Sequence, residues 1–151
     1  MNLTRSQAIL VMPVDNITAV LTLHDGERVE CMLFVPDGED VSQVVEPGKP
    51  FVPVVRRGRV CLIARAAIAC VAVSKRLAGQ QCDEDMPTVT QQVQVKLRSG
   101  AVIEGELRWI PPEPRKRTSD HLNAEPPYFV VNGPETAHFV VKAHVATVAE
   151  A

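Results

Sequence analysis

Apolar and polar residues alternate along several short stretches of the chain, in the two-residue period of a half-buried β-strand. The clearest stretch is 17–24, where one face is apolar and the other carries threonine, valine and histidine. The residues of the apolar face are Ala19, Leu21 and Leu23. Asp25-Gly26 follows as a turn dipeptide, because glycine tolerates the positive φ of a tight hairpin, and a second strand returns over 28–35.

This pattern occurs twice. Leu-His-Asp-Gly-Glu-Arg-Val-Glu-Cys-Met-Leu at 23–33 is repeated as Leu-Arg-Ser-Gly-Ala-Val-Ile-Glu-Gly-Glu-Leu at 97–107, with Gly26 and Gly100 in the same place. Three further segments match in the same order: 41–45 with 118–122, 50–52 with 128–130, and 63–68 with 140–145. The sequence therefore predicts a duplication of one small β-unit, with length differences taken up in loops.

The predicted strands fall into two sets separated by a linker at 74–92, where the composition changes. Strands of the first set are expected at 8–14, 17–24, 28–35, 51–55, 60–64 and 66–73. Strands of the second set are expected at 93–97, 101–110, 128–131, 139–141 and 144–149. Between them we expect a helical turn or strand at 41–45, a helical turn at 75–78, and a short helix at 119–123 with Ser119 as its N-cap. The predicted units are 8–73 and 93–150.

The bulk composition suits a folded chain with an aliphatic core. Of the 151 residues, 46% are hydrophobic and 23% charged, while only 4% are aromatic, so the core must be built from valine, isoleucine, leucine and alanine. Each half is near the lower size limit for an independent core and gains by packing against the other. We therefore expect a mainly β fold in which the two halves pack together.

The net charge and the cysteines limit the possible partners and the cellular compartment. The formal net charge of −2 gives no bulk attraction for nucleic acid or an anionic membrane. This net charge is still compatible with a local basic patch. The four cysteines, Cys31, Cys61, Cys70 and Cys82, are not in Cys-x-x-Cys spacing, and three lie in apolar strand patterns. They are predicted to be buried free thiols of a cytoplasmic protein. The apolar run 8–14 is short and contains Pro13, so we expect no signal peptide and no membrane span.

Residue patterns typical of catalysis are missing from the sequence. It has no Gly-x-Ser-x-Gly elbow, no phosphate-cradling loop and no Cys-His signature. His121, His138 and His144 lack the spacing of metal ligands, and the acidic cluster 83–85 would disfavour a thiolate at Cys82. We therefore expect a protein that is not an enzyme, with no cofactor, no bound metal and no small-molecule substrate.

A resemblance to a known family rests mainly on the second copy. Its order of strand, glycine, hydrophobic-Glu-Gly-x-Leu and a late Val-Lys-Ala-His-Val resembles the Sm-like family of small SH3-type β-barrels, whose five short bent strands close on themselves. It also looks like an uncharacterised bacterial branch of such barrels, whose inserted loop carries Arg-x-Ser-Asp-x-Leu-Asn, here 117–123. The first copy keeps only Ser42 and its apolar neighbours. The resemblance covers about three quarters of the chain and implies two tandem Sm-like, SH3-like small β-barrels with one or two short helices in loops.

RNA-binding members of that family hold bases with an Asp and an Asn after the second strand and an Ile-Arg-Gly segment before the fifth. Asp120 and Asn123 are similar to the first pair, but they stand closer together and beyond an insertion. Lys142 and Arg65 are each followed by alanine, which puts a methyl group where the family's glycine allows close approach to a base. Nucleic acid is therefore the alternative partner rather than the favoured one.

The favoured hypothesis is a protein-interaction or assembly module. It would bind a protein partner, or another copy of itself, through exposed strand edges and the loop at 111–123. The candidate binding residues are Arg115, Lys116, Arg117, Ser119, Asp120, His121 and Asn123. We expect His121 to fix the inserted helix against its barrel and the basic turn at 56–59 to be a solvated loop. The alternative is an RNA-binding protein that uses the basic loop with Arg65 and Lys142.

Overall fold

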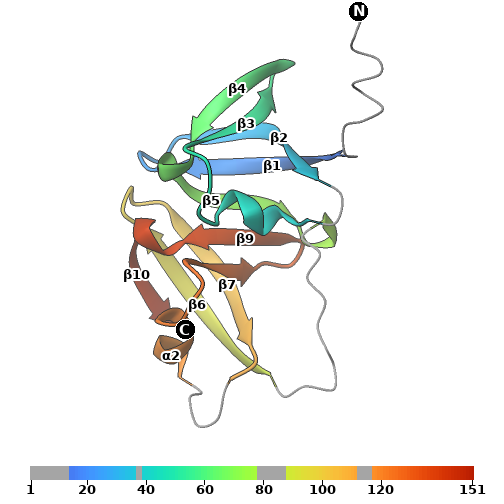
Figure 1. Ribbon diagram of the computed structural model, residues 1–151. Helices are drawn as coiled ribbons and strands as arrows, with labels where there is room; N and C mark the ends of the chain where they lie inside the picture. The colour runs from blue at the N-terminus through green and yellow to red at the C-terminus, as the bar shows by residue number, and fades with distance from the viewer. Residues whose placement is uncertain (1–13, 37–38, 78–87, 112–116) are drawn as a thin grey trace, which may run out of the picture.

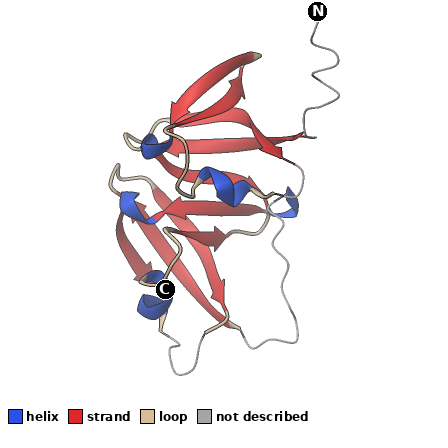
Figure 2. Cartoon of the chain, viewed as in Figure 1, coloured by secondary structure: helices blue, strands red, loops and turns tan. Residues whose placement is uncertain are grey.

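The computed structural model describes residues 14–36, 39–77, 88–111 and 117–151 (Figure 1). Within these described residues, ten antiparallel strands form one sheet, and the helical elements are one short α-helix and lone 3-10 turns (Figure 2). The mainly β fold predicted from the sequence is confirmed. Most of the strand expected at 8–14 lies outside the described residues, as do Cys82, Arg115 and Lys116.

The first half contains five strands, joined by the predicted turns. They are β1 (Val14–Leu23), β2 (Arg28–Pro36), β3 (Phe51–Arg56), β4 (Arg59–Ala64) and β5 (Ile68–Ser74). Its 3-10 turns are η1 (Val41–Val44), η2 (Arg65–Ala67) and η3 (Lys75–Leu77), so the ambiguous segment at 41–45 is helical. Gly26 has φ +93°, as the β1–β2 hairpin requires.

The second half repeats this series. Its strands are β6 (Val89–Leu97), β7 (Val102–Trp109), β8 (Tyr128–Asn132), β9 (Thr136–Val141) and β10 (Val145–Glu150). Its helical elements are α2 (Thr118–Leu122) and the 3-10 turn η4 (Lys142–His144). The N-cap prediction is wrong, because α2 begins at Thr118 and is preceded by Arg117. The Asp120 carboxylate accepts the Arg117 backbone N–H at 3.2 Å, so it closes the first turn from within.

Backbone hydrogen bonds match between the halves. The Leu23 N–H donates to the Glu27 carbonyl at 2.8 Å, and the Leu97 N–H donates to the Ala101 carbonyl at 2.9 Å. One predicted correspondence shifts by a residue. Phe51 pairs with Ala64 and Tyr128 pairs with Val141, so Phe51 is the counterpart of Tyr128 rather than of Phe129.

The order of strands shows how the halves join. Across the sheet it is β10-β6-β7-β8-β9-β5-β1-β2-β3-β4. Each half therefore has the order fifth, first, second, third, fourth, and the two halves follow one another head to tail. They meet where β5 of the first half pairs with β9, the fourth strand of the second half. β4 and β10 are left as the two outer strands.

Two clusters of buried side chains form the core, one for each half, and the halves exchange residues at their joint. Ala137 and Phe139 of β9 belong to the cluster of the first half. Ala69 and Cys70 of β5 belong to the cluster of the second half. Because each joining strand contributes to both clusters, the two predicted units share their hydrophobic core at the β5–β9 pairing.

Candidate interaction site

The predicted binding residues that the structure describes lie on or beside α2. Arg117, Ser119 and Asn123 are exposed, whereas Asp120 is half-buried and accepts the Arg117 N–H. The Asn123 N–H donates to the Ser119 carbonyl at 2.9 Å and ends the helix. Three of these four residues are therefore accessible to a partner.

His121 lies on the inner side of this helix. Its ring stacks on the indole of Trp109 in β7, with centroids 4.7 Å apart and planes inclined by 5°. Burial, and then the charge of Lys142, lowers the pKa of His121, so the neutral ring is favoured. The stack holds α2 against β7, which is the arrangement expected from the sequence, and it leaves His121 as a packing residue.

Arg65 turns inward. Its guanidinium donates four hydrogen bonds to backbone carbonyls in and after η1, and Gly48 packs so closely on it that an added Cβ would lie 3.0 Å from Nη2. The accepting residues are Lys49 (2.7 Å), Val44 (2.8 Å), Gln43 (2.9 Å) and Glu46 (3.0 Å). Arg65 therefore satisfies the free carbonyls at the end of a helical turn.

Lys142 has the corresponding place in the second half. Its ammonium group donates to the carbonyl of Ala124, just after α2. Desolvation lowers the pKa of Lys142, and Glu125 opposes that shift. The two residues named as nucleic-acid contacts thus each anchor the insert of their own half. Sequence reasoning missed this role, although a basic residue at the same position of both copies was a signal for it.

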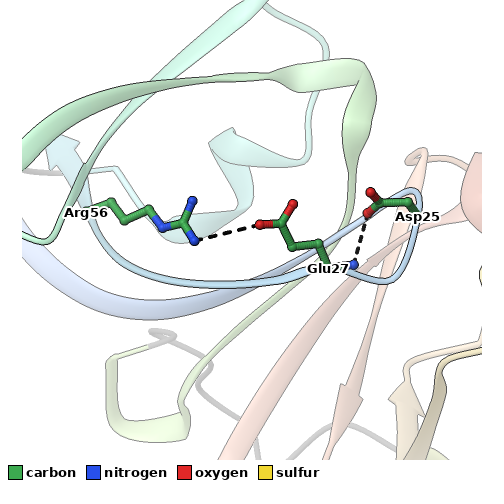
Figure 3. A network of polar contacts seen from close by, with 3 residues as sticks. All are labelled: Asp25, Glu27 and Arg56. Atoms are coloured by element: carbon green, nitrogen blue, oxygen red, sulfur yellow. Dashed lines mark hydrogen bonds and ion pairs between the residues drawn. The ribbon is translucent and has the colours of Figure 1, made fainter.

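The basic turn at 56–59 borders a shallow hollow. Arg56 forms an ion pair with Glu27 at 3.7 Å, and the Asp25 carboxylate accepts the Glu27 N–H at 3.0 Å (Figure 3). The residues around the hollow are Val20, Arg28, Glu30, Arg56 and Arg57. Arg57 has φ +52°, in keeping with the tight β3–β4 turn. Carboxylates offset part of the positive charge here, so the hollow is a mixed surface rather than a strong anion site.

The outer strand β4 presents an apolar surface. Phe51 of β3 is 56% exposed, and Val60 and Leu62 of β4 are 67% and 63% exposed; we call these three residues the β4 face. No charged residue interrupts the strand from Val60 to Ala64. Within the described part of the chain, no strand pairs with the outer side of β4. Edges of this kind are usually blunted by charges, because unpaired backbone groups invite another strand.

The other outer strand, β10, is also unpaired on its outer side as far as the structure is described. Val145 and Val148, like Leu122 of α2, are half-buried and pack against the cluster of the second half; we call these three residues the β10 face. Ala146 and Thr147 are exposed. The inserted helix and β10 therefore both pack on the cluster of the second half.

The other histidines of the second half and the described cysteines have the surroundings of structural residues rather than those of a reactive site. His144 Nε2 lies 2.8 Å from the Ala66 carbonyl, so this nitrogen carries the proton and donates between the two halves. Burial, and then Arg28, lowers the pKa of His138. Cys31 and Cys70 are free and buried, as predicted, and burial raises their pKa values to about 11 and about 12. Cys61 is free but only half-buried, so the predicted burial is wrong for this thiol. Within the described ranges, no group of three or more His, Cys, Asp or Glu side chains converges as metal ligands would.

The comparisons with known proteins gave no match. This holds for family models, for curated proteins and for solved structures. The Sm-like resemblance therefore stays a prediction from short motifs. None of the helices described here has the length and apolar character needed to cross a membrane.

Proposed function

We propose that the protein is a non-enzymatic interaction and assembly module of the cytoplasm, which binds a protein partner through its outer strand edges and α2. The observation that carries the proposal is the β4 face, where three large apolar side chains flank an unpaired strand edge. An extended segment of a partner can add to such an edge, because its backbone groups satisfy the free N–H and C=O groups while its side chains cover the apolar ones.

The β10 face supports the same function at the other end of the sheet. Val145 and Val148 are only half-buried there, and α2 packs on the same cluster through Leu122 while Arg117, Ser119 and Asn123 are exposed at or beside the helix. Polar residues around a small apolar centre are the usual anatomy of a protein interface. The part of the predicted loop at 112–116 lies outside the described residues, so the proposal rests on α2 and the two faces.

RNA binding is the weaker alternative, since no observation favours it. The Nε and Nη1 donors of Arg65 are occupied by backbone carbonyls, and the Lys142 ammonium group donates to the Ala124 carbonyl. RNA binding would still be recognised by affinity for single-stranded oligonucleotides that falls steeply with salt concentration.

Capture of partners by the tagged full-length protein from extracts of its native cells tests the proposal. Leu62→Arg on the β4 face and Val148→Arg on the β10 face should each remove the partners that bind that face, the protein itself included. Val102→Arg is the matched control, because Val102 is 54% exposed on the interior strand β7. Equal recovery of every partner by the wild type and by both edge variants would refute the proposal.

A further inference from the structure

We infer that the partner of these two faces is a second copy of this chain. In this arrangement β4 of one molecule pairs with β10 of the next and repeats the β5–β9 joint between the halves. The inference rests on the proposed function and makes it specific. It is argued from the order of the strands, the burial of equivalent residues and the register of the existing joint.

The strand order makes the two ends of the sheet complementary. Inside the molecule, a fifth strand, β5, pairs with a fourth strand, β9. At the ends, the free strands are a fourth strand, β4, and a fifth strand, β10. Joining the β4 edge of one molecule to the β10 edge of another therefore continues the sheet in the order already present within the chain.

Burial at the β4 end differs sharply from burial at its internal counterpart. Ala137 and Phe139 of β9 are 0% and 3% exposed, because they pack into the cluster of the first half. Their counterparts in β4 are Val60 and Leu62, which are 67% and 63% exposed. The same repeat positions are thus apolar in both copies but covered in only one.

The aromatic residue of the neighbouring third strand is partly buried at the internal joint and exposed at the β4 end. Tyr128 lies 6.1 Å from Phe139, measured between ring centroids, and packs against the cluster of the first half. Its counterpart Phe51 is exposed next to Leu62. The β4 face is therefore the surface that β8 and β9 use at the internal joint, here without a neighbour among the described residues.

At the β10 end too, residues are more exposed than their counterparts at the internal joint. Ile68 and Val71 of β5 are fully buried in the cluster of the first half, whereas their counterparts Val145 and Val148 are only half-buried. On the opposite side of the strand, the buried residues Ala69 and Cys70 correspond to the exposed residues Ala146 and Thr147. A neighbouring β4 placed as β9 is placed on β5 would pair with Thr147 and Val148, the counterparts of Cys70 and Val71.

The register of the new joint follows from the internal one. Val71 lies opposite Phe139, and Ala72 lies opposite His138. Transferring these pairs to the equivalent residues places Val148 opposite Leu62. It also places Ala149 opposite Cys61, on the other face of the ladder. Leu62 would then pack toward the β10 face, where Leu122 and Val145 border the second cluster.

Two differences indicate that the joint between molecules is weaker than the joint within one. His144 donates to the Ala66 carbonyl across the internal joint, but its counterpart Ala67 has no donor in its side chain. Glu150 also replaces the buried Val73 at the end of the fifth strand. Association should therefore be reversible and should increase with chain concentration. A head-to-tail contact of this kind closes as a ring or extends as a filament, depending on the rotation at each joint.

Mass measurement by light scattering or sedimentation, over a wide range of chain concentration, tests the inference on the full-length protein. The wild type and the Val102→Arg control should form species heavier than the 16.5 kDa chain. Leu62→Arg and Val148→Arg should each be monomeric, with association weakened on the order of 30-fold or more. Each variant keeps one intact face, so a mixture of the two should form a one-to-one dimer and nothing larger.

Disulfide trapping tests the register separately. Ala149→Cys, in a chain that also carries Cys82→Ser, should give a crosslink between the introduced thiol and Cys61 of another molecule under mild oxidation. Peptide mapping would identify the linked pair, and Cys61→Ser should abolish it. The same Cys61→Ser change without Ala149→Cys controls for folding, as do the far-ultraviolet circular dichroism spectra of all variants.

A monomeric wild type at submillimolar concentration would overturn the inference, as would a mixture of the two blocked variants that forms no dimer. Oligomers that survive both edge substitutions would overturn it too. These failures are distinct from failure of the proposed function. If the wild type is monomeric but Leu62→Arg still loses a captured protein, the edge binds a different protein and the proposed function stands.

Discussion

Replacing Phe139 with alanine should destabilise the whole molecule, because this side chain of the second half fills the cluster of the first. Phe139 is 3% exposed and lies opposite Val71 in the β5–β9 ladder. Truncation of a buried phenylalanine costs about 3–5 kcal/mol in lost transfer free energy and an unfilled cavity. That is a large share of the roughly 5–15 kcal/mol that stabilises an ordinary domain.

The assay is equilibrium unfolding in urea, read by two probes at a chain concentration below that of association. Fluorescence of Trp109, the single tryptophan, reports on the second half, and far-ultraviolet circular dichroism reports on both halves. The two curves should coincide and move together to a lower midpoint with an unchanged slope, because β9 contributes to both clusters.

Leu62→Ala is the matched control: Leu62 stands at the same repeat position but is 63% exposed, so its effect on the free energy of unfolding should stay within about 0.5 kcal/mol. Separate transitions for the two probes, or equal losses of stability at both positions, would show that Phe139 does not link the two clusters.

Three further predictions concern single residues. Arg65→Ala should lower the free energy of unfolding by roughly 2–4 kcal/mol, since it orphans four carbonyl acceptors, whereas Arg59→Ala at an exposed position should change it little; urea unfolding compares the two. Gly105→Ala should cost about 1–3 kcal/mol in the same assay, because the new Cβ would lie 2.6 Å from the Asn132 carbonyl oxygen, and a neutral result would contradict that close approach. The lowered pKa of His121 means that the fold favours its neutral form, so stability should be complete above the ordinary histidine pKa of about 6.5 and should fall as the pH drops below it. Thermal unfolding at several pH values should show a smaller decline in His121→Phe, and an unchanged decline would mean that this histidine is not its source.

Much of the fold could be read from local pattern. The alternation in 17–24 placed Ala19 and Leu21 inside, and Gly26 and Gly100 marked hairpins that the structure contains. Local pattern did not locate the first residue of the inserted helix. The side chains of Thr118, Ser119 and Asp120 can each accept a hydrogen bond from the free backbone N–H groups of a first turn, and only the final backbone path selects among them. The anchoring roles of Arg65 and Lys142 also escaped sequence reasoning, since their carbonyl partners depend on how each insert folds back.

Local sequence pattern establishes that the chain is a repeated set of short amphipathic strands, because a two-residue period and glycine turns act over a few neighbouring residues. Long-range packing establishes which of the two equivalent fourth strands is covered. β4 and β9 are both apolar on the relevant face, and nothing in their local sequence marks Leu62 as exposed and Phe139 as buried. That difference arises because β5 pairs with β9, a contact between residues far apart in the chain, and a chain of two repeats has one internal joint and two free ends.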